Sequence, residues 1–408
     1  MGRRTRKDSR RDSEPLRPES VGPQRRTAGQ RALLGLGTLL VLALLAGAGA
    51  VAWTSAKFRS IDREDVLLDE PVSGPANYLI VGSDSRSRVD PDDPGGDGSG
   101  SESRAALADT MMIVRIDPES ETVKMLSMPR DLWVTLPNGK KGRLNAAYAH
   151  GPQELIDTLR TELGIPINHY IEVDFKGFQG VVDAIGGVPM WFDRAMRDRN
   201  SGLDVLHPGC VTLDGRSALA FARARHLQYW EDGGFEYDGT GDLGRISRQQ
   251  VFVRRVLDRA SDRGFGNPIT MKRLIEVGVD NVTLDGGLSV GTLIGIGERF
   301  ADFDSDDLQT FTVPATPRTT DGGAAVLDID RTAAEPILAK FRDEPAGATT
   351  TTPPTSSSTS PSSTSTIYGE STSTSEAEAT TTTTSATTAS TEPVGIVPGD
   401  PPPGKSCG

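Results

Sequence analysis

Carboxylate side chains lie at the ends of two apolar, strand-like stretches of the 408-residue chain. Asp84 comes two residues after the run NYLIVG, and Asp109 immediately precedes the run TMMIVRI. If the two strands are neighbours, both carboxylates converge, and Mg²⁺ is typically held by one or two carboxylates together with substrate phosphates. These residues therefore predict a magnesium site, and the alternative is that each aspartate caps a turn or pairs with an arginine.

Arginine is the second kind of side chain at these strand ends. Arg86 follows Asp84 by two residues, and Arg130 with its neighbour Asp131 follows the strand-like run TVKMLSM. The guanidinium group is permanently charged, and its forked N–H groups match the oxygens of a phosphate. We expect Arg130 to bind a phosphate with Asp131 holding it in place, and the alternative is a surface salt bridge.

A further group of arginines follows in the middle of the chain. In an extended segment Arg223 and Arg225 would project to the same side, while Arg245 and Gln249, four residues apart, share one face of a helix. The Gly-rich stretch 231–244 separates the two pairs as an insert. Converging arginines repel one another unless an anion neutralises them, so these side chains predict a pyrophosphate site.

Other catalytic motifs are missing from the sequence. It has no GxSxG elbow, no GxxxxGK[ST] loop after a strand, no HRD or DFG kinase motif, and no histidines at zinc spacing. Carboxylates for a metal and arginines for phosphate oxygens remain. These groups suit phosphoryl transfer, because its catalysis consists mostly of positioning and charge stabilisation.

Strand-like and helix-like patterns alternate in the part of the chain that must position these residues. Alternation of this kind favours an α/β layered domain. An antiparallel hairpin is expected from 110–116 and 122–128, because two β-rich runs flank the turn residues DPESE. The run 132–136 is expected to extend the sheet of this hairpin. Further strands are expected at 77–82, 169–175 and 188–192, helices at 152–163, 178–185 and 242–260, and closing strand-helix pieces near 308–314 and 325–341.

The N-terminal part predicts a membrane anchor. Residues 1–31 form a basic segment of net charge +6, and the uncharged apolar run 32–53 is long enough to span a bilayer once. The basic excess predicts a cytoplasmic N-terminus and an extracytoplasmic remainder. The alternative is a cleaved signal peptide, since small residues near the end of the run resemble a cleavage site. The total charge of −12 leaves −18 after residue 31, which argues against nucleic acid as a partner.

Composition divides the remainder of the chain. We expect a tether at 54–76, a catalytic domain at 77–260, the C-terminal part of the same globular unit at 261–345, and a disordered Thr/Ser/Pro-rich tail at 346–408. A polar, Gly-rich insert at 90–103 is expected as a surface loop. The two cysteines, Cys210 and Cys407, define no disulfide framework. Cys210 fits a buried or unpaired thiol better than a nucleophile, and a bond to Cys407 stays an open alternative.

Several motifs, in this order, resemble the LytR-CpsA-Psr family. They are GSDSR at 82–86, ADTMM at 108–112, SMPRD at 127–131, LNAAYAHG at 144–151, HYIEVDFKGF at 169–178, VVDAIGGV at 181–188, LDGRSALAFARAR at 213–225 and DLGRISRQQ at 242–250. The resemblance implies a three-layer α/β/α domain with a central mixed sheet and a groove for a polyprenyl tail. It implies that Asp84 and Asp109 bind magnesium. It also implies that Arg86, Arg130, Arg223, Arg225, Arg245 and Gln249 bind a pyrophosphate.

By the same resemblance, the expected activity is transfer of a glycopolymer (arabinogalactan, teichoic-acid-like or capsular) from a polyprenyl-pyrophosphate carrier to a peptidoglycan sugar hydroxyl. The expected catalytic residues are Asp84, Asp109, Arg130 and Arg225, with Mg²⁺ as cofactor. The enzyme would act outside the cytoplasmic membrane, held there by one helix. Two alternatives remain: a polyprenyl-pyrophosphate phosphatase, and a non-catalytic protein that binds or senses polyprenyl phosphate. The inserts at 90–103 and 231–244 flank the expected site and leave the choice of glycan open.

Overall fold

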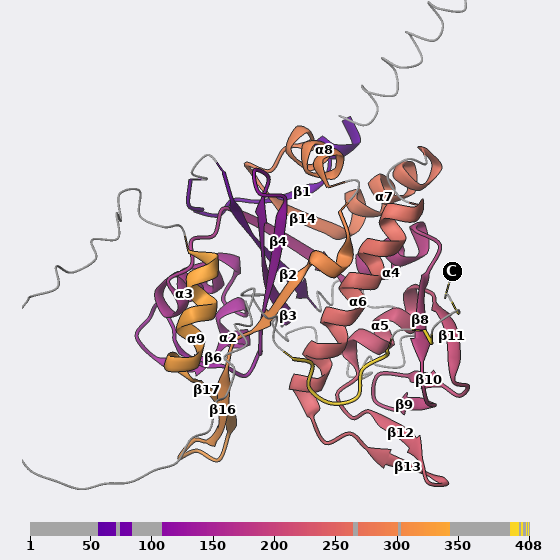
Figure 1. Ribbon diagram of the computed structural model, residues 1–408. Helices are drawn as coiled ribbons and strands as arrows, with labels where there is room; N and C mark the ends of the chain where they lie inside the picture. Colours follow the sequence, from indigo (N-terminus) through magenta and orange to yellow (C-terminus); the bar gives the residue numbers. More distant parts are fainter. Residues whose placement is uncertain are drawn as a thin grey trace, which may run out of the picture. The chain divides into compact units, whose positions relative to one another are not determined.

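The computed structural model describes residues 56–70, 74–83, 108–263, 268–300, 303–342, 392–399, 401–402, 405 and 407 (Figure 1). Contacts divide the chain into Met1–Ala56 and Lys57–Gly408, and the fold below is that of the second unit. The expected membrane helix at 32–53, the insert at 90–103, Asp84 and Arg86 lie outside the described residues. Among the residues that are described, no helix combines the length and apolar character that a membrane crossing requires.

A mixed seven-stranded sheet forms the centre of the fold, in the order β1-β14-β7-β2-β3-β4-β15. β3 runs antiparallel to β2 and β4, whereas β2 is parallel to β7 and β4 is parallel to β15. The expected hairpin is therefore confirmed as β3 and β4. The strands span Asp62–Glu64 (β1), Ala76–Ser83 (β2), Ala108–Asp117 (β3), Thr122–Met128 (β4), His169–Asp174 (β7), Val282–Asp285 (β14) and Gln309–Thr312 (β15).

Helices cover both faces of this sheet (Figure 1). On one side lie α2 (Leu144–Tyr148), α3 (Pro152–Leu163) and α9 (Arg331–Leu338), and on the other α4 (Phe175–Ala184), α6 (Gly241–Arg263) and α7 (Pro268–Asn281). Side chains alternate along β2: Leu79 and Val81 pack into the core with α3, whereas Ile80 belongs to the cluster with Leu257 of α6. The expected α/β fold with a mixed sheet and flanking helices is confirmed.

Capping residues mark where several helices begin and end. α3 starts at Pro152 and stops before Gly164, which adopts φ = 65°, as the sequence predicts. α4 starts three residues earlier than expected, because the Asp174 carboxylate caps it by accepting a hydrogen bond from Gly177 N (2.7 Å). α5 (Gly215–Arg223) is capped by Asp214 in the same way. The segment at 223–225 is thus not extended as expected, because Arg223 is the last residue of a helix.

Smaller sheets extend from the central one. A four-stranded sheet has the order β10-β9-β12-β13. Its strands are Leu203–Val205 (β10), Met196–Asp198 (β9), Gln228–Glu231 (β12) and Gly234–Tyr237 (β13); the other small pairs are β8 (Val188–Phe192) with β11 (Gly209–Leu213), β5 (Trp133–Thr135) with β6 (Lys141–Arg143), and β16 (Ala315–Thr319) with β17 (Ala325–Ile329). α8 (Val290–Arg299) and the short 3-10 helices Ser305–Asp307 and Ala339–Phe341 complete the described elements.

Two expectations about these strands are wrong. The run 132–136 does not extend the central sheet, because β5 turns back at residues 137–140 and pairs with β6. The insert 231–244 is not a plain loop, because its first part completes the β12–β13 hairpin. Asp232 (φ = 47°) and Gly233 (φ = 87°) make the turn, and two successive positive φ angles are the signature of a type I′ hairpin turn. An Asp-Gly pair between aromatic residues was the sequence signal for this hairpin.

The end of the chain packs back onto the domain. Cys210 of β11 and Cys407 form a disulfide, which corrects the expectation that Cys210 is an unpaired thiol. Ile396 N donates to an Asp238 carboxylate oxygen (3.0 Å), and Gly399 forms a β-bridge with Trp191. The expectation of a disordered tail throughout 346–408 is therefore wrong for residues 392–399. Residues 346–391 lie outside the described residues.

Candidate active site

Antiparallel pairing brings the first two candidate residues to one edge of the central sheet. Asp109 lies at the start of β3 and Arg130 two residues beyond the end of β4, and these ends are paired through Met111 and Met128. Arg130 Nη1 donates to Asp109 Oδ1 at 2.7 Å. The end of β2 reaches the same edge, because Ser83 pairs with Ala108. The two strand ends that carry Asp84 and Asp109 are therefore neighbours, as expected, although Asp84 itself is not described.

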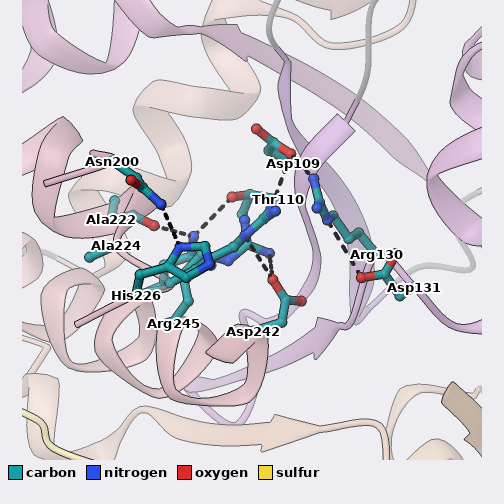
Figure 2. Close-up of polar contacts among 12 residues, drawn as sticks. Asp109, Thr110, Arg130, Asp131, Asn200, Ala222, Ala224, His226, Asp242 and Arg245 are labelled. Carbon is teal, nitrogen blue, oxygen red and sulfur yellow. Dashed lines mark hydrogen bonds and ion pairs between the residues drawn. The ribbon is translucent and has the colours of Figure 1, made fainter. Parts of the chain in front are cut away.

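Two arginines from the other half of the domain complete the cluster (Figure 2). Arg225 follows α5, and its Nη2 lies 3.2 Å from Asp109 Oδ1 while its Nε lies 3.1 Å from Asp242 Oδ1. Asp242 Oδ1 also lies 2.9 Å from Nη2 of Arg245, three residues further along α6. Arg130 and Arg225 thus reach the same carboxylate oxygen, although they come from different ends of the domain sequence. We call Asp109, Arg130, Arg225, Asp242 and Arg245 the arginine cluster.

The arginine cluster carries an excess of positive charge. Three guanidinium groups face two carboxylates, so its formal net charge is +1. Burial raises the pKa of Asp109, but Arg225, Arg245 and Arg130 outweigh that effect and hold the pKa below its usual value. Burial lowers the pKa of Arg245 to about 10, against the opposing effect of Asp242. The formal excess of one positive charge attracts an anion.

Asp109 is hydrogen-bonded to its arginines, whereas the contacts of Asp242 are ion pairs without an aligned hydrogen bond. In the part of the chain that the structure describes, the buried Nε atoms of Arg130, Arg225 and Arg245 and both carboxylate oxygens of Asp242 make no hydrogen bond. The Arg225 Nε lies 3.1 Å from Asp242 but its N–H is not aligned with the carboxylate. Misaligned charged groups of this kind gain free energy if an anion reorients them, because hydrogen bonds to ions are strong only when geometry is good.

Asp131 plays a smaller part than expected. Its carboxylate lies 3.7 Å from Arg130 Nε but 3.3 Å from the Nε of Arg143. Arg130 is therefore held mainly by Asp109, at 2.7 Å. Of the two ion pairs of Arg130, the one with its sequence neighbour Asp131 is therefore longer than the one with Asp109.

The remaining expected residues lie in different surroundings. Gln249 Nε2 donates both to Thr110 Oγ1 (3.1 Å) and to the carbonyl oxygen of Ala222 (2.8 Å), so it links α6 to β3 and to the end of α5. Arg223 lies with its guanidinium 4.6 Å from the ring centroid of Phe175. Arg223 also lines a polar pocket of about 220 Å³ together with Gln179, Ser201, Asp214, Arg216 and Ser217. Arg86 lies outside the described residues, and its expected role stays a prediction.

The donor set allows a magnesium ion but does not enclose one. Within the described ranges, no group of three or more His, Cys, Asp or Glu side chains could hold a metal. Both ion pairs of Asp109 use Oδ1, so Oδ2 takes part in neither of them. Because Mg²⁺ keeps several waters and is commonly bound by one or two carboxylates plus phosphate oxygens, Asp109 fits as one such ligand.

Comparison with known proteins supports the resemblance seen in the motifs. The LytR_cpsA_psr family model matches residues 49–343. The chain belongs to the LytR-CpsA-Psr family. The expectation drawn from the motifs at 82–250 is thereby confirmed, and the match extends beyond them on both sides.

Curated LytR-CpsA-Psr proteins align with part of their own length. The chain is 30% identical over 257 residues to the probable cell wall biosynthesis protein LcpB of Corynebacterium glutamicum, covering 62% of this chain and 57% of LcpB. It is 32% identical over 214 residues to the polyisoprenyl-teichoic acid–peptidoglycan teichoic acid transferase TagV of Bacillus subtilis, covering 50% of this chain and 51% of TagV. The chain thus spans little more than half the length of these two relatives.

Solved structures of the LytR-CpsA-Psr family share the fold. The LytR-Csp2A-Psr enzyme from Actinomyces oris superposes with a TM-score of 0.56 at 25% identity, covering 70% of this chain and 97% of that one. Bacillus subtilis TagV superposes with a TM-score of 0.51 at 25% identity, covering 66% and 97%. The α/β fold described above is therefore that of the family.

Two acidic residues of the site were missed by sequence reasoning. Asp242 bridges Arg225 and Arg245, and its signal was an acid three residues before an arginine at a helix start. Asp198 is fully buried at the end of β9, and one of its oxygens accepts hydrogen bonds from the backbone N of Arg225 (2.8 Å) and of His226 (2.7 Å). Nothing local in the sequence singles out Asp198 among its charged neighbours.

Proposed function

We propose that this LytR-CpsA-Psr protein is a phosphotransferase that moves a glycopolymer from a polyprenyl-pyrophosphate carrier to a sugar hydroxyl of peptidoglycan. The observation that carries the proposal is the convergence of Arg130 and Arg225 on one oxygen of Asp109. The net positive charge of the arginine cluster fits a pyrophosphate. The names of its relatives, a teichoic acid transferase and a cell wall biosynthesis protein, support the same reaction class.

The reaction needs no covalent bond to the protein. A sugar hydroxyl attacks the glycan-bearing phosphorus, a new P–O bond forms, and the P–O bond to the second phosphate breaks. Polyprenyl phosphate leaves with the electron pair, and the hydroxyl proton passes to solvent. Arg130 and Arg225 stabilise the charge that develops on the phosphate oxygens, and Asp109 holds both guanidinium groups in place. The lowered pKa of Asp109 makes it a weak proton acceptor, so positioning is its role.

A magnesium ion belongs to this proposal. Asp109, together with Asp84 from the neighbouring strand end, would hold it, and it would neutralise charge on the phosphate oxygens. Arg86, Arg223, Arg245 and Gln249 are proposed as further residues of the pyrophosphate site. Arg245 is 2% exposed, and Gln249 donates a hydrogen bond to Thr110 Oγ1. These two residues contribute by fixing the arginine cluster and the start of α6.

We place the enzyme at the outer face of the cytoplasmic membrane, anchored by residues 32–53. The disulfide between Cys210 and Cys407 supports this location, because disulfides persist in oxidising compartments. Holding the domain beside the membrane would raise the effective concentration of its lipid-linked substrate. The arginine cluster contacts the pyrophosphate and not the sugars. Contacts outside the cluster therefore decide whether the glycan is arabinogalactan, teichoic-acid-like or capsular.

The test is transfer by the full-length protein in detergent, with a radiolabelled polyprenyl-pyrophosphate glycan and peptidoglycan as acceptor. We expect Arg130→Ala and Arg225→Ala each to lower kcat by about 10²–10³-fold, the loss typical of one charge-stabilising group. Arg160→Ala is the matched control, because Arg160 pairs with Asp69 at 2.7 Å and has similar exposure but lies on α3. Wild-type activity in both site variants would falsify the proposal. Release of glycan phosphate without ligation would identify a phosphatase instead.

A further inference from the structure

The β12–β13 hairpin presents aromatic side chains on one face. Trp230 pairs with Phe235, and Gln228 pairs with Tyr237, so all four side chains lie on the same side of the hairpin. The rings of Trp230 and Phe235 meet edge to face, with centroids 5.2 Å apart. Trp230 is 48% exposed and Tyr237 is 53% exposed. Large aromatic side chains gathered on an exposed surface commonly mark a binding site.

The neighbouring strand adds hydrogen-bonding groups to this face. Arg197 of β9 pairs with Gln228, donates to its Oε1 (3.0 Å), and lies 3.7 Å above the Phe235 ring. At the other end of the face, the His226 and Tyr237 rings stack with centroids 6.4 Å apart. Asn200 Nδ2 lies 3.0 Å from His226 Nδ1. We call this surface the aromatic platform; it consists of Arg197, Asn200, His226, Gln228, Trp230, Phe235 and Tyr237.

The chemistry of the aromatic platform suits a sugar ring. A pyranose has an apolar C–H face that packs on aromatic rings, and a rim of hydroxyl groups that both donate and accept hydrogen bonds. Trp230 and Tyr237 supply the rings, while Gln228, Asn200 and Arg197 supply amide and guanidinium groups at their edges. Flat, rigid side chains lose little conformational entropy when a ligand stacks on them.

The charge of the hairpin disfavours anionic partners. The stretch QYWEDGGFEY at 228–237 contains three acids and no lysine or arginine. Of these acids, Glu231 is paired with Arg194 (3.5 Å), whereas Asp232 and Glu236 are exposed at the turn and on the opposite face. An anionic lipid surface would be repelled by this turn, whereas an uncharged glycan would not.

The aromatic platform meets the arginine cluster at the open end of the hairpin, opposite the turn, where Gln228 pairs with Tyr237. Arg225 and His226 are consecutive, and one oxygen of the buried Asp198 holds the backbone N–H groups of both. After Tyr237, at the same open end, the chain enters α6, which carries Asp242 in its first turn and Arg245 three residues later. Figure 2 shows the contact between Asn200 and His226 at this end of the platform. A ligand that extends from Trp230 to the His226 end of the platform therefore approaches the phosphate that the cluster would bind.

We infer that the aromatic platform is the binding site for the acceptor saccharide, a strand of amino sugars, and that it presents a sugar hydroxyl to the phosphate in the arginine cluster. The inference rests on the proposed function and adds the residues that recognise the acceptor. Trp230 and Tyr237 bind the sugar and take no part in bond making or breaking. Donor binding and acceptor binding are thereby assigned to separate surfaces.

Two measurements on the full-length protein in detergent test this assignment. In the first, binding of soluble N-acetylglucosamine oligosaccharides is followed by saturation-transfer NMR without any donor. We expect wild type to bind, and the double variant Trp230→Ala/Tyr237→Ala to weaken binding about tenfold, because both exposed rings that would stack on the sugar are removed. In the second, the same variant should raise the KM for the acceptor about tenfold, with kcat at saturating acceptor and the KM for the donor unchanged.

Matched controls lie on and near the same hairpin. Glu236→Gln changes the opposite face of β13, and Leu206→Ala removes an exposed apolar side chain outside the aromatic platform. Both should bind and transfer as wild type does. An unchanged acceptor KM in Trp230→Ala/Tyr237→Ala, with transfer intact, overturns the inference but leaves the proposed function standing. If the wild-type protein binds oligosaccharides through Trp230 but transfers no glycan, the platform is supported as a saccharide site and the proposed function is contradicted. The inference is also overturned if the wild-type protein binds phosphatidylglycerol vesicles through Trp230 and does not bind oligosaccharides.

Discussion

At the scale of single residues, the site depends on carboxylates that hold arginines. Asp109 fixes Arg130 and Arg225 through one oxygen, and Asp242 joins Arg225 to Arg245. Lone arginines at these positions would repel one another, so the two acids allow three guanidinium groups to approach closely. The acids also leave the cluster one positive charge in excess, which a phosphate can neutralise.

The pH dependence of stability should reveal the charge on Asp109. Its pKa in the folded protein lies below the unfolded value of about 3.9, so its ion pairs stabilise the fold above that pH. The stabilisation is lost as the pH falls through the folded-state pKa. We expect the difference in unfolding free energy between wild type and Asp109→Asn to be constant above about pH 4 and to shrink below it. Urea unfolding between about pH 3 and pH 7 measures this; a difference that grows on acidification contradicts the assignment.

A second residue-scale prediction concerns Asp198, which positions Arg225 and touches no substrate. Asp198→Asn replaces an acceptor oxygen by an amide N–H, so the backbone N–H groups of Arg225 and His226 lose a charged partner. We expect the unfolding free energy to fall by about 1.5–3 kcal/mol and transfer activity to fall with it. Asp204→Asn, on the exposed face of β10, is the control. Equal stability of the two variants in urea would contradict this role.

At the scale of elements, the packing of α5 on α4 sets where Arg225 emerges. A Cβ on Gly215, the first residue of α5, would overlap the carbonyl oxygen of Gln179 in α4. The two helices approach this closely only because residue 215 is glycine. The chain then leaves α5 at Arg223 and passes through Ala224 to Arg225.

Gly215→Ala should therefore separate the two helices. We expect a loss of about 1–3 kcal/mol in unfolding free energy, because the obstacle is backbone and cannot rotate away. The control is Gly278→Ala in α7, where a Cβ would meet nothing within 4 Å. There we expect a gain of up to about 1 kcal/mol from helix propensity. Thermal unfolding followed by circular dichroism distinguishes the two, and a stabilised Gly215→Ala variant would show that the contact is not tight.

At the scale of the whole molecule, one disulfide joins β11 to the end of the chain. Cys210 and Cys407 are 197 residues apart, so the bond closes a long loop that includes α5, α6 and the expected tail. Near its end, Ile396 reaches the Asp238 carboxylate and its carbonyl oxygen accepts from the fully buried Arg248 (3.3 Å). The tail is thereby attached to the same helix, α6, that carries Arg245.

Removing the disulfide should destabilise the whole domain. Cys210→Ser/Cys407→Ser frees a long loop in the unfolded chain, and loop entropy alone predicts a loss of about 5 kcal/mol. Hydrogen exchange should rise at residues 392–399, where Ile396 N is hydrogen-bonded to Asp238. Urea unfolding with and without reductant measures the stability, and a wild-type protein insensitive to reductant would contradict a structural role for the bond.

Local patterns by themselves determined most of the central sheet and the helices beside it. Two β-rich runs around the turn residues DPESE predicted β3 and β4, and Pro152 with Gly164 predicted both ends of α3, because these signals act over a few residues. The motifs also predicted the family and Arg130 and Arg225 as partners of one site. The hairpin at 228–237 also has a local signal, the Asp-Gly pair at its turn, but the Gly-rich composition of 231–244 masks it.

Only the tertiary structure decided how the site is assembled. Asp109 and Arg225 are 116 residues apart in sequence. Their contact exists because α6 and the loop after α5 pack against the start of β3. The partners Asp242 and Asp198, the stacking of Arg223 on Phe175, and the bond from Cys210 to Cys407 follow from the same packing. Sequence patterns report interactions between near neighbours, whereas ion pairs between distant segments depend on how whole elements pack together.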